Sequence, residues 1–257
     1  PPPFPPNGTS LLRLRSAPAG FLNNVMIGAA HALACYEEIE RVAIFDFDYT
    51  LADSSEGVID CVQTAQETMG LEISDAEPIR RTIGLSVQDT IVRLNGESLR
   101  ERAEEFATLF RQHADEVMVD HTRLYEGVPA LFAALAQRGL SCAIATTKYR
   151  YRIEQILRRD GLEEAVHCIV GAEDVTEHKP DPACLLHVLA SLRNEAQEAI
   201  YVGDSAPDAG AAQRAGIDFV LVETGLAALS SLDSYPRVAQ LKVATDLPDW
   251  LARRETT

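Results

Sequence analysis

The sequence predicts an α/β protein: a doubly wound parallel sheet with an all-helical cap inserted after its first strand. Three observations lead to this fold class. From residue 123 onward, short apolar runs alternate with helical patterns, which is typical of a parallel sheet covered by helices on both faces. Residues 56–122 carry no strand signal. Polar residues directly follow several apolar runs, as expected at the ligand-binding edge of such a sheet.

The strands are predicted from short apolar runs. RVAIFDFD, Arg41–Asp48, combines β-branched and aromatic residues and predicts a buried first strand. Four later runs have the same character: SCAIATT, VHCIVGAED, AIYVGDS and IDFVLVETG. Together these runs predict about five core strands.

The helices are predicted from the spacing of apolar residues. VIDCVQTAQETMGL and RERAEEFATLFRQHADEV have helical spacing, so the cap is placed at residues 56–122. YEGVPALFAALAQRG predicts another helix, which Gly139 closes. The core domain is therefore expected at residues 25–55 and 123–257.

The N-terminal residues 1–24 are rich in proline and carry arginine but no acidic residue. They are interpreted as a disordered leader, a transit-like targeting segment or residues left over from cloning. Two interpretations fit the following run VMIGAAHALAC: the apolar part of a secretory signal, or a short helix from Ala29 to Glu40.

Composition limits the classes of function. Hydrophobic residues make up 46% of the 257 residues and charged residues 24%, as in ordinary soluble globular proteins. The formal net charge of −16 argues against sequence-independent nucleic-acid binding and against docking on anionic lipid. It does not exclude an anionic substrate, because a metal ion and a few cations can reverse the sign inside one pocket.

The length of the apolar runs and the spacing of the cysteines indicate the cellular compartment in which the protein is expected. No apolar run reaches the ~18 residues that a membrane span needs, so no membrane partner is expected. The five cysteines are scattered and form no C-x-x-C, which argues against zinc and redox motifs. Cysteines of this kind favour a reducing compartment. We therefore expect a cytoplasmic protein, with organelle targeting by the N-terminal segment as the alternative.

Four polar signals follow predicted strands or lie in loops. They are Asp46 in DFDYTL, Thr146 in IATTK, Lys179 in HKPDP, and Asp204 with Asp208 in GDSAPDAGAAQRAG. Each alone has an ordinary explanation, such as a turn, a β-forming threonine, a loop pair or a helix cap. Their joint occurrence in this order points to one site at one edge of the sheet.

This combination resembles the haloacid dehalogenase superfamily, in its phosphatase branch with a helical cap, from about Val42 to Trp250. Within that branch DFDYTLADSS, RRTIGLSVQDTI, TTK and GDSAPDAGAAQRAG are most like the phosphoglycolate phosphatase group. The resemblance implies a Rossmann-like core. It also implies Mg²⁺-dependent hydrolysis of a small phosphorylated metabolite, such as 2-phosphoglycolate, through an aspartyl phosphate.

The resemblance implies a role for each acidic residue. Asp46 would be the nucleophile. The expected Mg²⁺ ligands are the carboxylates of Asp46 and Asp204 and the backbone carbonyl of Asp48. Asp208 is placed with the metal residues, acting through water or by holding Lys179. Asp48 would also protonate the leaving alcohol and then take a proton from water, which favours phosphate-ester chemistry over dehalogenation.

The resemblance also implies the phosphate contacts. Thr146 and the backbone around Thr147 would donate hydrogen bonds to phosphoryl oxygens, and Lys179 would supply a second positive charge. One residue departs from the family pattern: Tyr49 stands where a glycine commonly follows the acid. The turn must therefore accommodate a side chain, whose ring would lie toward the cap.

The sequence identifies neither the substrate nor the cap residues that contact it. Arg80 and Arg81 are either contacts to a substrate carboxylate or part of a solvated helix face. Lys148 either faces the pocket or lies at an exposed helix start. The histidines at 113, 121 and 178 need no catalytic role. Alternative functions are a sugar phosphomutase, a pyrophosphatase, a nucleotidase or a catalytically silent binding module, and the oligomeric state is undetermined.

Overall fold

The computed structural model describes residues 41–226 and 229–255. The predicted leader at residues 1–24 and the predicted helix at Ala29–Glu40 lie outside these residues. All of the described residues belong to one compact unit.

A six-stranded sheet forms the core, and every neighbouring pair of strands in it is parallel. In order across the sheet the strands are β5 (Cys168–Val170), β4 (Leu140–Ala145), β1 (Arg41–Phe45), β6 (Ala199–Gly203), β7 (Asp218–Val222) and β8 (Ala239–Leu241). The predicted parallel sheet is confirmed, with a correction to the strand number. The sixth strand, β8, is only three residues long and has no apolar run that would predict it.

Alternating residues of β1 point to opposite faces of the sheet. Ala43 and Phe45 belong to one buried cluster, and Val42 and Ile44 belong to another. The first cluster is covered by α6, α7 and α10, and the second by α8 and α9. A strand buried on both faces explains the continuous apolar run in the sequence. The bounds of these helices are α6 (Val128–Gln137), α7 (Arg150–Arg159), α8 (Ala183–Leu192), α9 (Ala206–Ala215) and α10 (Leu247–Glu255).

Between β1 and β4 the chain forms the helical cap. Its helices are α2 (Ser55–Thr68), α3 (Ala76–Arg80), α4 (Val87–Asn95), the 3₁₀ helix η1 (Glu97–Arg102) and α5 (Ala103–Val117). A short antiparallel pair joins its two ends: β2 (Ala52–Asp53) and β3 (Arg123–Leu124). The cap has its own apolar cluster, which includes Ile79, Ile91 and Phe106. The insertion of an all-helical segment is confirmed, while the exact domain limits stay a prediction.

The remaining 3₁₀ helices lie in connections of the core. They are η2 (Glu163–Ala165), η3 (Ala172–Asp174), η4 (Ala196–Glu198), η5 (Leu229–Leu232) and η6 (Ala244–Asp246).

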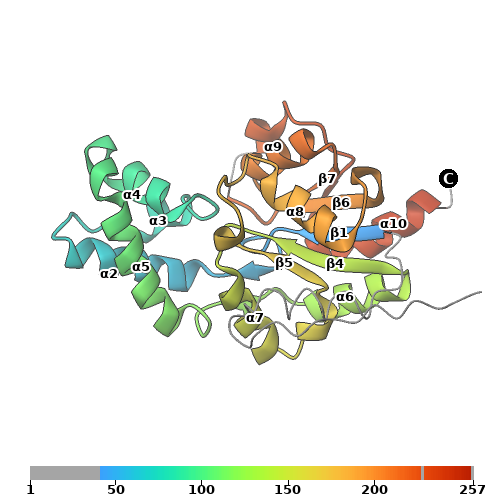
Figure 1. Ribbon diagram of the computed structural model, residues 1–257, viewed down its shortest axis with the longest axis horizontal. Helices are drawn as coiled ribbons and strands as arrows, with labels where there is room; N and C mark the ends of the chain where they lie inside the picture. Colours follow the sequence, from blue (N-terminus) through green and yellow to red (C-terminus); the bar gives the residue numbers. More distant parts are fainter. Residues whose placement is uncertain (1–40, 227–228, 256–257) are drawn as a thin grey trace, which may run out of the picture. The chain divides into compact units, whose positions relative to one another are not determined.

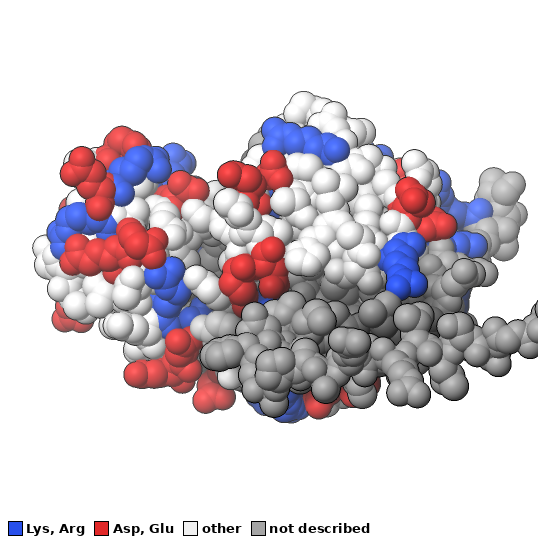
Figure 2. Space-filling view, viewed as in Figure 1, with Lys and Arg blue, Asp and Glu red and all other residues white. Residues whose placement is uncertain are grey.

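The charged residues of the cap are mixed in sign. Arg102 pairs with Glu105, and Arg81 pairs with Glu77. Figure 2 shows red and blue atoms intermixed where Figure 1 draws α3, α4 and α5. The visible face of the cap therefore presents no extended basic surface of the kind that nucleic acids require.

The helices and the cysteines can be compared with the expectations for a membrane span and for zinc or redox motifs. Within residues 41–226 and 229–255, no helix has the length and apolar character needed to cross a membrane. The four cysteines in these ranges are free, and burial raises the pKa of Cys142 to about 12. A thiol with so high a pKa is almost entirely protonated near neutral pH, so it is a poor nucleophile and a poor metal ligand.

Candidate active site

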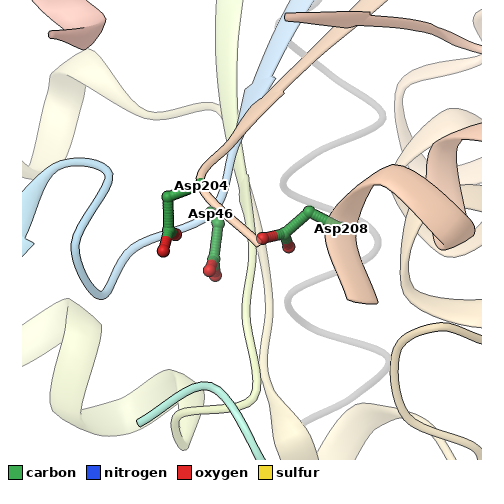
Figure 3. Close-up of side chains that lie close together, drawn as sticks. All are labelled: Asp46, Asp204 and Asp208. Atoms are coloured by element: carbon green, nitrogen blue, oxygen red, sulfur yellow. The ribbon is translucent and has the colours of Figure 1, made fainter. Parts of the chain in front are cut away.

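Three aspartates meet at the carboxyl edge of the sheet. Asp46 follows β1, Asp204 follows β6, and Asp208 lies in the first turn of α9. Figure 3 shows their side chains gathered together, and one oxygen from each lies within 4.8 Å of the others. All three are buried. Carboxylate oxygens in such a group are the ligands that Mg²⁺ prefers.

Asp208 is fixed by the helix that carries it. It shares a capping box with Ser205, whose backbone N–H donates to Asp208 Oδ2 at 3.1 Å. Lys179 Nζ and the Tyr201 hydroxyl donate to Asp208 Oδ1 at 2.6 and 2.7 Å. Gly203 permits this approach, because an added Cβ would lie 2.7 Å from Asp208 Cβ. Both carboxylate oxygens of Asp208 are therefore already engaged by the protein.

Lys179 links Asp208 to Asp46. Its Nζ lies 2.6 Å from Asp208 Oδ1 and 2.9 Å from Asp46 Oδ1. Burial lowers the pKa of Lys179, but Asp208 and then Asp46 raise it by more, so the ammonium stays charged. The structure thus brings Lys179 beside Asp46, although the two residues lie far apart in the sequence.

The negative charge around Asp46 and Asp204 exceeds the positive charge that the neighbouring Lys179 supplies. Burial raises the pKa of Asp46 to about 7, although the positive charge of Lys179 lowers it; the negative charge of Asp208 raises it further. Burial, followed by repulsion from Asp208 and Asp46, raises the pKa of Asp204 well above its usual range. When ionised, the three aspartates and Lys179 give −3 and +1, a net charge of −2. A divalent cation fits this site in charge and in ligand chemistry.

Asp48 lies beside these residues but has its own partners. The Ser54 hydroxyl donates to Asp48 Oδ1 at 2.6 Å, and Lys148 Nζ lies 3.3 Å from the same oxygen. The carboxylate of Asp48 does not belong to the group of three that could hold a metal ion. The contribution of its backbone carbonyl to a metal site stays a prediction.

Of the two positions expected for Lys148, facing the pocket or lying at an exposed helix start, the structure shows a buried side chain. Its side chain is 6% exposed and faces Asp48 instead of the solvent. The signal in the sequence was its position two residues after Thr146, in the loop that follows β4. The direction of a side chain in such a loop depends on the backbone turn, which the sequence alone does not reveal.

The two threonines after β4 differ in position. The Thr146 backbone N–H donates to Val170 O at 3.0 Å, and its hydroxyl oxygen accepts from Lys148 N at 3.2 Å. The hydroxyl hydrogen of Thr146 has no described acceptor and can be donated to a bound oxyanion. Thr147 is half-buried and lines a small cavity together with Asp48 and Lys148.

Tyr49 occupies the turn in which the resemblance described above leads us to expect a glycine. Its φ of 59° lies in the left-handed region, so the turn accommodates the side chain at some cost in backbone strain. The ring is buried. Burial, and to a lesser extent the negative charge of Asp53, raise the pKa of Tyr49 to about 12. Tyr49 lines a cavity of about 540 Å³ together with Arg80 and Asp204.

The structure separates the two cap arginines. Arg80 Nη1 donates to Ser55 Oγ at 2.8 Å, and Arg80 makes no ion pair with a described acidic residue. Arg81 pairs with Glu77, and its side chain is 70% exposed. Both line the 540 Å³ cavity. Arg80 therefore has the greater capacity to bind an anion.

Cap and core are joined next to the site. Arg152 of α7 donates through Nη2 to Asp115 Oδ1 at 2.7 Å and to Arg111 O at 3.0 Å. Arg111 Nη1 donates to the Tyr149 hydroxyl at 3.2 Å. These contacts hold α5 of the cap against the start of α7, directly after the loop that carries Thr146, Thr147 and Lys148.

The contacts of Asp208 lead to a prediction. Asp208→Asn is expected to lower the free energy of unfolding by about 3 kcal/mol, because Lys179 loses its nearest buried counter-charge. Urea unfolding in excess chelator measures this. Asp204→Asn is the matched control, since it removes one charge from the same group but breaks no ion pair with a described residue. Equal losses in the two variants would contradict the assigned role of Asp208.

Comparisons with known proteins agree with the observed fold. Residues 43–222 match the family model for haloacid dehalogenase-like hydrolases. A phosphoglycolate phosphatase of Aquifex aeolicus is 30% identical over 191 residues, covering 74% of this chain and 88% of the relative. Pyrophosphatase PpaX of Bacillus cereus is 29% identical over 211 residues, covering 80% and 94%. The crystal structure of a haloacid dehalogenase-like hydrolase from Bacteroides fragilis is 35% identical, with a TM-score of 0.77, covering 80% and 99%.

Proposed function

The chain belongs to the haloacid dehalogenase-like hydrolase family, and on that premise we propose that it is a Mg²⁺-dependent phosphomonoesterase acting on a small phosphorylated metabolite. One observation carries the proposal. Asp46, at the end of the central strand, lies against the buried Lys179 ammonium and beside Asp204. This arrangement supports the proposed roles of Asp46 as nucleophile, Lys179 as a positive charge and Asp204 as a metal ligand.

The metal would be held by the carboxylates of Asp46 and Asp204, with the Asp48 carbonyl as a further ligand. When bound, Mg²⁺ would neutralise charge between the Asp46 carboxylate and the phosphate of the substrate. Asp208 supports the site by orienting Lys179, since both of its oxygens are already engaged.

Asp46 attacks phosphorus with a carboxylate oxygen and forms an aspartyl phosphate as the bond to the leaving oxygen breaks. Lys179 stands beside Asp46, where negative charge develops on the phosphoryl oxygens. The Thr146 hydroxyl donates a hydrogen bond to one of these oxygens. Buried contacts with Asp208 and the Tyr201 hydroxyl hold Lys179 in this position.

Asp48 supplies the proton chemistry. It gives a proton to the leaving oxygen and then takes one from the water that attacks the aspartyl phosphate. Hydrolysis releases inorganic phosphate and restores the Asp46 carboxylate. The Ser54 hydroxyl, 2.6 Å from Asp48 Oδ1, holds the acid in one orientation.

A pyrophosphatase is the second candidate, because the similar PpaX carries that name. A phosphomutase is less well supported. An acid–base pair of the cap at the substrate would favour such an enzyme, and the described cap pair His113–Asp60 lines neither of the two cavities beside the aspartates.

Phosphate release from a panel of phosphorylated metabolites and pyrophosphate, measured with Mg²⁺ and with chelator, tests the proposal. We expect Mg²⁺-dependent hydrolysis of at least one small ester. A panel without any hydrolysed compound, including p-nitrophenyl phosphate, would contradict it.

A further inference from the structure

A small cavity lies between the cap and the loop that follows β4. Its volume is about 60 Å³. The core contributes Asp48, Thr147 and Lys148, and the cap contributes Thr82, Thr90 and apolar side chains such as Phe110. The proposed proton donor and a buried lysine therefore line the same small cavity.

We propose that this cavity binds the leaving group of the substrate and that Lys148 binds a negative charge on that group. The inference rests on the proposed function and specifies its substrate class. The substrates are phosphate esters or anhydrides whose leaving group is small and anionic.

The charge of Lys148 supports this assignment. Its ammonium has three N–H donors, and its described acidic partner, Asp48 Oδ1, lies 3.3 Å away. This distance exceeds the ~2.8 Å of a tight charge-assisted hydrogen bond. Lys148 therefore retains the capacity to bind a second anion. The other cation that lines the cavity, Arg152, is already engaged by Asp115.

The size of the cavity limits the leaving group. A water molecule needs about 10–15 Å³ of such space, so 60 Å³ holds roughly four to six small groups. The carboxymethyl group of 2-phosphoglycolate and the second phosphoryl group of pyrophosphate each have about four non-hydrogen atoms beyond the bridging oxygen and fit this limit. Sugars, nucleosides and phosphopeptides exceed it.

The larger cavity is the competing location. It holds about 540 Å³ and lies beside Asp204, and Ile83, Gly84 and Leu85 of the cap line both cavities. Asp48 lines only the smaller one. A leaving group in the larger cavity would lack the proposed proton donor, so the smaller cavity is the better site.

The test compares charged and neutral leaving groups of similar size. Lys148→Met removes the charge and keeps most of the side-chain volume. The substrates are 2-phosphoglycolate, pyrophosphate and the neutral analogue 2-hydroxyethyl phosphate. We expect kcat/KM for one or both anionic substrates to fall roughly 10- to 100-fold more than for the neutral one, as for a lost charge-assisted hydrogen bond. The matched control is Lys242→Met, since the Lys242 side chain is 81% exposed and pairs with Glu223.

Comparing the two anionic substrates shows which kind of negatively charged leaving group Lys148 binds. A selective loss for 2-phosphoglycolate points to a carboxylate, and a selective loss for pyrophosphate points to a second phosphoryl group. An equal loss for charged and neutral substrates would mean that Lys148 only positions Asp48, and would overturn the inference.

Wild-type enzyme gives a second test that does not depend on the folding of a variant. It should hydrolyse one of the small anionic substrates at least roughly 10-fold better than the neutral 2-hydroxyethyl phosphate and the larger glucose 6-phosphate. Hydrolysis of the neutral or the larger ester at an equal rate would overturn the inference while the phosphatase function stands. Absence of any hydrolysis would instead contradict the proposed function.

Discussion

Asp46→Asn is expected to abolish hydrolysis of whichever phosphorylated compound the wild type hydrolyses fastest, while the protein stays folded. The amide keeps the shape of the side chain but cannot act as a nucleophile at phosphorus. A loss of roughly 10⁴- to 10⁶-fold in kcat is expected for removal of a nucleophile. Stability should change little, because Lys179 retains Asp208 at 2.6 Å and one of the mutually repelling carboxylates is neutralised. Initial rates and a thermal melting curve measure the two effects.

Asp218→Asn is the control for the same chemical change. Its side chain is 58% exposed at the start of β7, and its nearest ion-pair partner, Arg254, is 3.9 Å away. This variant should keep the wild-type rate. Turnover by Asp46→Asn at a comparable rate would show that another residue is the nucleophile.

Much of the site could be predicted because its residues follow strongly apolar strands. Asp46, Thr146 and Asp204 come directly after β1, β4 and β6, and parallel strands place their carboxyl ends at one edge. The edge strand β8 could not be predicted in the same way. It has three residues, of which only Leu241 is buried, so its formation depends on pairing with β7.

Side-chain directions in loops and contacts across the chain could not be predicted. Arg80 and Arg81 are adjacent in the sequence, yet one contacts Ser55 and the other pairs with Glu77 in solvent. The Tyr201 hydroxyl, which supports Asp208, belongs to a strand whose sequence indicates only burial. Such contacts arise from the packing of distant segments, for which a single sequence carries no signal.

Mg²⁺ is expected to stabilise the protein as well as activate it. Asp46 and Asp204 are buried close together and repel each other, so a bound cation relieves a cost that the metal-free protein bears. At a Mg²⁺ concentration about 100 times Kd, linkage contributes about 2.7 kcal/mol, a rise in Tm of roughly 5–10 °C for a chain of this size. Melting curves with Mg²⁺ and with excess chelator measure the rise. Activity should disappear in chelator and return with Mg²⁺.

Asp204→Asn separates metal binding from the rest of the site. The variant removes one ligand charge and keeps an oxygen that can accept from Thr50, whose hydroxyl lies 3.1 Å from Asp204 Oδ1. Its Tm in chelator should equal or exceed that of the wild type, because one repelling charge is gone. Its Tm rise with Mg²⁺ should be much smaller, and Asp218→Asn should keep the full rise. An equal rise in Asp204→Asn and wild type, or full wild-type activity in chelator, would exclude a metal site at Asp46 and Asp204, because a bound divalent cation must depend on the charge of its ligands.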